Sequence, residues 1–157
     1  MCIRDRSRIV HVSSVAQRPI DFGDVMLEAD YSDGRAYAQS KLAQIMFTID
    51  LAEELAGSGV TTNAVHPASM MDTDMVLERG ARARSSVHDG ADAVMHLIDG
   101  DDLGSGGYFN QMTPATANPQ AYDPRARERL RTLAERLTAE ATDPVSSKPL
   151  SGRSQSH

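Results

Sequence analysis

Hydrophobic and polar residues change their spacing along this chain in a way that predicts strands and helices in turn. A run rich in β-branched residues over 8–14 ends in polar groups, as a buried parallel strand does. Over 36–56, apolar residues recur at steps of three and four, which predicts a long helix with one buried face that stops at Gly57 and Gly59. A second strand is predicted over 60–66, ended by Pro67. This order predicts a βαβ unit of an α/β fold, with a right-handed crossover.

The remaining segments have weaker patterns. Residues 15–35 predict a long loop, and a short helix over 89–98 and a third strand over 107–111 follow later. The methionine-rich segment 68–86 lacks periodicity, and either a substrate lid or loop methionines packing on the core would explain it. Pro124 opens a last helix with an apolar stripe of Leu130, Leu133 and Leu137. The arginines of this helix predict a solvated face: Arg125, Arg127, Arg129, Arg131 and Arg136.

Composition narrows the function classes. At 157 residues, with 40% hydrophobic and 24% charged residues, the chain suits one globular domain. Its net charge of −6 disfavours nucleic acid as a partner, because phosphate binding needs a positive face. One cysteine gives neither a disulfide framework nor a thiolate metal cluster, and the histidines lack ligand-like spacing. With no apolar stretch long enough for a membrane span, we expect a cytoplasmic protein with no membrane partner.

Tyr37 and Lys41 are the candidate chemical pair. Residues four apart share a helix face, so the ammonium is expected near the phenol or near a ligand beside it. A nearby positive charge lowers the pKa of a phenol from about 10 toward working pH. Such a tyrosine can exchange a proton with a carbonyl or alcohol oxygen while another group moves a hydride. Ser13 and Ser14 end the first strand, and open α/β sheets bind ligands beyond the carboxyl ends of their strands.

Three motifs together resemble the short-chain dehydrogenase/reductase family: Ser13-Ser14, Tyr37-Ala-Gln-Ser-Lys41 and Thr62-Asn-Ala-Val-His-Pro67. Segments 8–14 and 40–47 are most similar to the retinol-dehydrogenase-like branch of this family. That branch also has a long segment between the serine and the tyrosine, and here Ser14 and Tyr37 are 23 positions apart. The resemblance covers about 8–111. It implies the C-terminal half of a doubly wound parallel-sheet Rossmann-type fold.

The resemblance also implies residue roles. Tyr37 would be the general acid/base, Lys41 would lower its pKa and bind the nicotinamide ribose together with it, and Ser14 would hydrogen-bond the substrate oxygen. The segment that borders the nicotinamide of NAD or NADP would contain Pro67, Ala68 and Thr73.

Two positions depart from the family pattern, and one motif is missing. Ala68 occupies the position where the family usually has glycine. The family's threonine that contacts the nicotinamide carboxamide would be expected nearer to position 72, which is an aspartate here, so Thr73 matches it only approximately. The glycine-rich turn that would approach the pyrophosphate does not occur before Ser13. The residue that would select between NAD and NADP is missing with it.

The domain assignment follows from these observations. Residues 1–7 resemble a non-native leader, and the native protein is expected to begin further upstream. Residues 8–141 would form the catalytic half of a dinucleotide-dependent oxidoreductase domain. Residues 142–157 are rich in serine and lack a core pattern, so we expect a disordered tail.

The resemblance implies an NAD(P)-dependent oxidoreductase that interconverts an alcohol and a carbonyl in a small-molecule substrate. A homodimer of the longer protein is implied by the same resemblance. A second hypothesis is a non-enzymatic binding or interaction module, inactive without the N-terminal half, since the phosphate-binding loop is missing. In a third, the resemblance is chance: Tyr37 is then a helix-boundary aromatic, Lys41 a surface lysine and Ser14 a strand-end hydroxyl.

Overall fold

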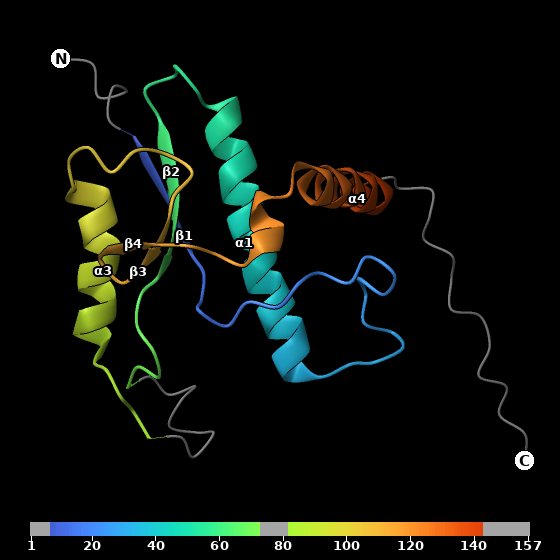
Figure 1. Cartoon of the computed structure of the whole chain (residues 1–157), viewed down its shortest axis with the longest axis horizontal. Coiled ribbons are helices and arrows are strands. Elements are labelled where there is room, and N and C mark those ends of the chain that lie inside the picture. The colour runs from blue at the N-terminus through green and yellow to red at the C-terminus, as the bar shows by residue number, and fades with distance from the viewer. Residues whose placement is uncertain (1–6, 73–81, 143–157) are drawn as a thin grey trace, which may run out of the picture.

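The computed structural model describes residues 7–72 and 82–142. Its elements are β1 (Arg8–Val12), α1 (Asp33–Glu54), β2 (Thr61–His66), α3 (Val87–Asp99), β3 (Tyr108–Asn110), β4 (Thr113–Ala115), the 3₁₀ helix η2 (Pro119–Tyr122) and α4 (Pro124–Thr142) (Figure 1). The three predicted strands and three predicted helices are present in the predicted order. Only residues 7 and 142 of the predicted leader and tail are described, so both predictions lie outside the described residues.

The strands form one sheet in the order β1-β2-β3-β4. β1 pairs in parallel with β2, and β2 with β3, as in a Rossmann-type sheet. β4, which was not predicted, is antiparallel to β3. The sequence did not reveal this hairpin because its turn lacks the usual glycine or asparagine, and Gln111 adopts the left-handed φ of 56° instead.

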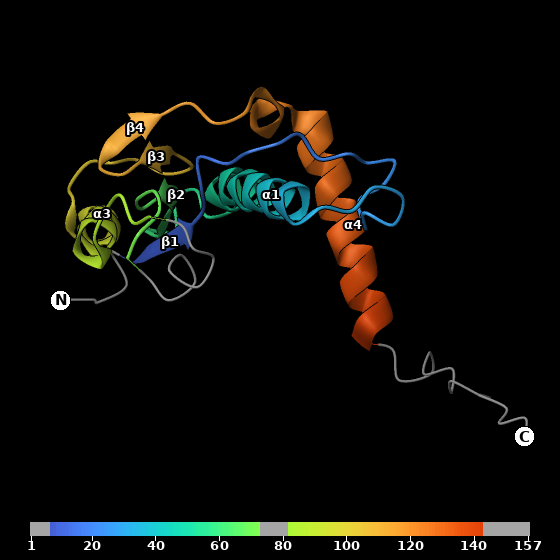
Figure 2. The same cartoon turned by 90° about the horizontal axis from the view of Figure 1, so that it is seen from below.

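The two crossover helices cover opposite faces of the sheet (Figure 2). Alternate strand residues point to opposite faces, so Ala64 and Tyr108 join the core cluster with α1 while Val65 and Phe109 join that with α3. Because β1, β2 and β3 are neighbours in sequence order, helices on opposite faces require crossovers of opposite hand. One of the two connections therefore departs from the usual right-handed form.

Helix α1 begins three residues earlier than predicted. Ser32 is its N-cap, and the side-chain oxygen of this serine accepts a hydrogen bond from the backbone N–H of Arg35. The predicted apolar face is confirmed, since Leu42, Ile45 and Met46 are fully buried. The capped start determines where the helix presents its polar residues to the end of β1.

Helix α4 begins at Pro124 as predicted, but the assignment of its arginines to a solvated face is wrong for Arg127. The Arg127 side chain is only 10% exposed, and its Nη1 lies 2.9 Å from both Asp50 Oδ1 and Glu53 Oε1 of α1. Arg127 lies on the face of α4 that meets α1, where these carboxylates compensate the buried charge. At the far end of the predicted stripe, Leu137 is exposed.

Candidate active site

Ser14 lies where predicted, just beyond the carboxyl end of β1. The preceding residue, Ser13, donates its backbone N–H to the carbonyl of Val65 at 2.7 Å and its hydroxyl to the carbonyl of Lys41 at 2.8 Å. These bonds attach the strand end to both β2 and α1. Ser14 itself is 6% exposed, and its Oγ accepts a hydrogen bond from the N–H of Ala16 at 3.1 Å.

Tyr37 and Lys41 occupy successive turns near the start of α1. The Lys41 ammonium lies 5.6 Å from the centre of the Tyr37 ring. It donates to the carbonyl of Val12 at 3.0 Å and to Gln44 Oε1 at 3.1 Å. Lys41 therefore links the end of β1 to the turn that bears the tyrosine, whose side chain is half exposed.

The chain after Ser14 runs along this turn of α1. The backbone N–H of Arg18 donates to the carbonyl of Ala38 at 3.4 Å. Together with the bonds of Ser13 and Lys41, this contact places the Ser14 segment beside the helix turns of Tyr37 and Lys41. All three predicted catalytic residues thus lie at the carboxyl-end edge of the sheet, and their roles stay predictions.

The end of β2 reaches the same edge. Pro67 and Ala68 follow the strand and are buried, as is His66. His66 Nε2 lies 2.9 Å from the hydroxyl of Ser69, and burial lowers the pKa of the His66 imidazole. The carbonyl of His66 accepts a hydrogen bond from the N–H of Gln111 at 2.7 Å. Thr73 lies outside the described residues.

Asp72, which departs from the family pattern, has a defined structural contact. Its Oδ1 accepts a hydrogen bond at 2.7 Å from the backbone N–H of Val87, the first residue of α3. The N–H of Asp72 donates to the carbonyl of Ser85 at 3.2 Å. A carboxylate at this position satisfies one of the free N–H groups at a helix start, where negative charge is favourable.

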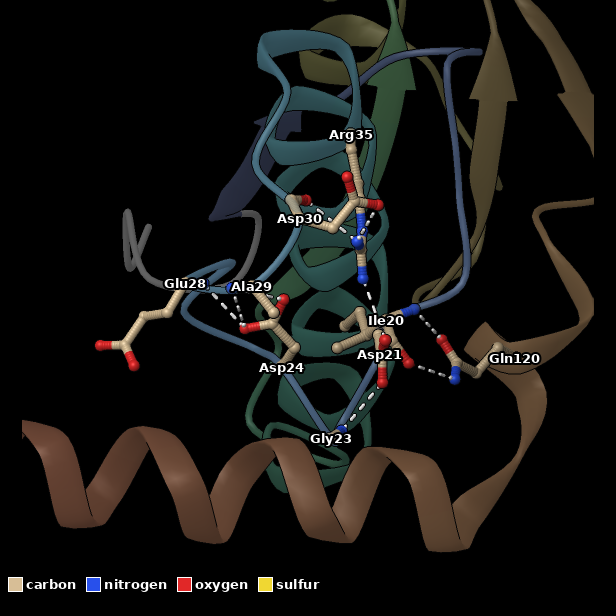
Figure 3. A network of polar contacts seen from close by, with 9 residues as sticks. All are labelled: Ile20, Asp21, Gly23, Asp24, Glu28, Ala29, Asp30, Arg35 and Gln120. Atoms are coloured by element: carbon tan, nitrogen blue, oxygen red, sulfur yellow. Dashed lines mark hydrogen bonds and ion pairs between the residues drawn. The ribbon is translucent and has the colours of Figure 1, made fainter.

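Arg35 orders the long loop between the predicted catalytic serine and tyrosine. Its Nη2 lies 2.9 Å from Asp21 Oδ2, and its Nη1 lies 2.8 Å from Asp30 Oδ2 (Figure 3). The same Nη1 donates to the carbonyl of Asp30 at 3.0 Å. Because the Arg35 side chain is only 12% exposed, one guanidinium holds two distant parts of the loop against the start of α1.

A glutamine from η2 holds the other side of this loop. Gln120 Oε1 accepts from the N–H of Ile20 at 2.6 Å, and Gln120 Nε2 donates to the carbonyl of Ile20 at 3.1 Å (Figure 3). Its amide thereby forms the paired bonds that a neighbouring strand would form. Ile20 is buried in the core cluster beneath α1.

Sequence reasoning missed Tyr108 as a residue of this region. Its hydroxyl donates to the carbonyl of Ser14 at 3.1 Å, across 94 positions of sequence. The one available signal was a tyrosine in a predicted buried strand, because a buried phenol hydroxyl needs a hydrogen-bond partner. The sequence offered no indication of which residue that partner would be.

The groups at this edge fit the ribose and nicotinamide part of a dinucleotide. The Lys41 ammonium and the half-exposed Tyr37 hydroxyl are donors suited to sugar hydroxyls, and the buried segment at Pro67 and Ala68 offers an apolar boundary. Within the described residues, no group of three or more His, Cys, Asp or Glu side chains could hold a metal ion. In the same part of the chain, no helix combines the length and the apolar character needed to cross a membrane.

Several known proteins are similar to this chain in sequence or in fold. Human retinol dehydrogenase 12 is 36% identical over 137 residues, covering 79% of this chain and 43% of that protein. Human retinol dehydrogenase 11 is 35% identical over 138 residues with the same coverage of each chain. An uncharacterized protein from Mycobacterium paratuberculosis has a crystal structure with a TM-score of 0.61 and 27% identity, covering 85% of this chain and 51% of its own.

The chain spans less than half the length of the curated relatives it matches. The family model described as short chain dehydrogenase matches residues 1–84, which include the serine, tyrosine and lysine motifs. The structure places these motifs on a strand end and on the following helix of an α/β sheet. The chain therefore belongs to the short-chain dehydrogenase family of oxidoreductases, with a retinol-dehydrogenase-like sequence.

Proposed function

We propose that this chain supplies the catalytic residues of an NAD(P)-dependent oxidoreductase that interconverts an alcohol and a carbonyl. The observation that supports the proposal is the Lys41 ammonium, which lies 5.6 Å from the centre of the Tyr37 ring while bonded to the end of β1. Family membership and the similarity to two retinol dehydrogenases, whose name describes an alcohol substrate, agree with it.

In the proposed reduction, Tyr37 donates the phenol proton to the oxygen of the substrate carbonyl. A reduced nicotinamide held by Lys41 and Tyr37 would supply the hydride for the carbonyl carbon, and one C–H and one O–H bond would then replace the C=O π bond. Lys41 stabilises the negative charge left on the Tyr37 oxygen, and Ser14 donates a hydrogen bond to the substrate oxygen. Because Tyr37 is half exposed, it can regain a proton from solvent.

Lys41 and Tyr37 would bind the ribose hydroxyls next to the nicotinamide, and Pro67 and Ala68 would border its ring. Thr73 is the proposed partner of the carboxamide. The proposal covers the reaction class only, because no feature of the described residues favours a retinoid over other moderately apolar carbonyl compounds.

Substitution of Tyr37 by phenylalanine in the full-length protein tests the proposal. We expect Tyr37→Phe to lower kcat for carbonyl reduction by about 10²–10⁴-fold, because a positioned acid/base contributes that much. Absorbance of the reduced nicotinamide follows the reaction.

The matched control is Tyr122→Phe, which removes the phenol hydroxyl of an equally exposed tyrosine on η2. We expect this control to keep the parent rate. A Tyr37→Phe enzyme as fast as the control would overturn the proposal and favour a binding module.

A further inference from the structure

The backbone carbonyl of Ser14 receives two side-chain hydrogen bonds. Gln17 Nε2 donates to it at 3.0 Å, and the Tyr108 hydroxyl donates at 3.1 Å. Ser14 lies past the last residue of β1, so these partners come from side chains of a loop and of β3 instead of from a paired strand. The Ser14 carbonyl is thus held by a residue close in sequence and by one far away.

The two donors are themselves fixed. Tyr108 is buried beneath α1 in the core cluster, with 6% of its surface exposed. Gln17 Oε1 accepts a hydrogen bond at 2.7 Å from the backbone N–H of Asn118, the N-cap of η2. Neither donor can move far without breaking contacts in β3 or before η2, so both set a defined position for the Ser14 carbonyl.

Burial raises the pKa of the Tyr108 phenol above its ordinary value, although a hydrogen bond with Gln17 acts in the opposite direction. The phenol therefore stays protonated at neutral and mildly alkaline pH. It remains a hydrogen-bond donor over that range of pH.

The position of this carbonyl affects the Ser14 hydroxyl. A peptide group is planar, so fixing its oxygen limits rotation about the Cα–C bond of the residue that bears it. On the other side, the N–H and hydroxyl of Ser13 are held by Val65 and Lys41. With its own carbonyl held and the preceding residue anchored, Ser14 has a restricted backbone, and the N–H of Ala16 donates to its Oγ at 3.1 Å.

We propose, on the basis of the function proposed above, that Tyr108 is a positioning residue that directs the Ser14 hydroxyl toward the substrate oxygen through the Ser14 carbonyl. Tyr108 does not touch the reacting atoms. Loss of the Tyr108 hydroxyl should therefore lower the rate of the chemical step and not substrate binding, because small displacements of a catalytic group reduce the rate far more than they reduce binding.

The test compares Tyr108→Phe with Tyr122→Phe in the full-length protein. Each substitution removes one phenol hydroxyl that makes one backbone hydrogen bond, since the Tyr122 hydroxyl accepts from the N–H of Ala117 at 2.9 Å. We expect Tyr108→Phe to lower kcat about tenfold with KM changed less than twofold. We expect Tyr122→Phe to leave both constants unchanged.

A double-mutant cycle with Ser14→Ala separates positioning from a general loss of structure. If Tyr108 acts through Ser14, adding Tyr108→Phe to Ser14→Ala lowers the residual kcat no further. A tenfold loss that persists in the Ser14→Ala background overturns the positioning role, as does a Tyr108→Phe enzyme with the parent kcat.

Gln17→Met provides a second route if Tyr108→Phe unfolds, because it removes the other donor to the same carbonyl. Its loss of kcat should also vanish in the Ser14→Ala background, and a loss that remains overturns the proposal. Full activity of Ser14→Ala alone would instead show that the serine role in the proposed function is wrong, and the positioning role would fall with it.

Discussion

At the scale of single residues, burial and specific partners determine the chemistry of the side chains. His11 shows this clearly, since its Nδ1 lies 2.8 Å from the hydroxyl of Thr48 and its ring meets Phe47 edge-on with centroids 5.5 Å apart. Burial lowers the pKa of His11, as it does for His66 at the end of β2. The two imidazoles therefore favour their neutral form in the folded chain.

These two histidines predict that the chain loses stability in mild acid. Below the unfolded histidine pKa of about 6.5, the unfolded chain binds more protons than the folded chain, so the free energy of unfolding falls as pH decreases. We expect urea unfolding to require less denaturant at about pH 5 than at about pH 7.

Nuclear magnetic resonance can attribute this effect to its source. The ring protons of His11 and His66 should titrate at lower pH in the folded chain than in the urea-unfolded chain. Titration of His11 and His66 at the same pH in the folded and the unfolded chain would show that their burial does not cause the loss.

At the scale of the elements, the space around two helix glycines determines whether alanine can replace each of them. Gly34 lies in the first turn of α1, where an added Cβ would meet no atom within 4 Å. Gly90 lies on the buried side of α3, where an added Cβ would overlap Met71 Sδ. The same substitution should therefore have opposite effects at the two positions.

We predict that Gly34→Ala raises the free energy of unfolding by about 0.5–1 kcal/mol, because alanine restricts the unfolded chain and favours the helix. Gly90→Ala should lower it by about 1 kcal/mol, since displacing the thioether outweighs the helical preference. Urea titrations of both variants give these values. An equal gain from both substitutions would show that Met71 moves aside freely.

At the scale of the whole molecule, the sheet has an open edge. Among the described residues β1 pairs with β2 on one side only, and Val12, Val15 and Phe47 are exposed around it. Free N–H and C=O groups beside apolar side chains offer a surface on which another strand can pair.

This edge predicts that the chain alone self-associates at concentrations on the order of micromolar. Val12→Lys should shift the mass measured by sedimentation toward the monomer, because a charge at an edge strand opposes pairing. The control is Val87→Lys, which adds the same charge at a comparably exposed valine on α3. A parent chain that stays monomeric, or equal shifts for both variants, would contradict the role of the edge.

Local sequence patterns determined much of the fold. The three-and-four spacing of Leu42, Ile45 and Met46 predicted the buried face of α1, because helix geometry alone places such residues on one side. The same geometry brought Lys41 near Tyr37, and strand polarity put Ser14 at a strand end. These features depend on neighbours within a few positions, so they are legible in the sequence.

Tertiary structure decided everything that depends on distant partners. The burial of Arg127 against Asp50 and the bond from Tyr108 to Ser14 each join segments that no local pattern relates. A residue's spacing indicates which way it faces, whereas only the folded chain determines what it meets there. For this protein, the sequence by itself proposed Ser14, Tyr37 and Lys41 as site residues, and the packing of β3 and η2 determined how the segment around Ser14 is held.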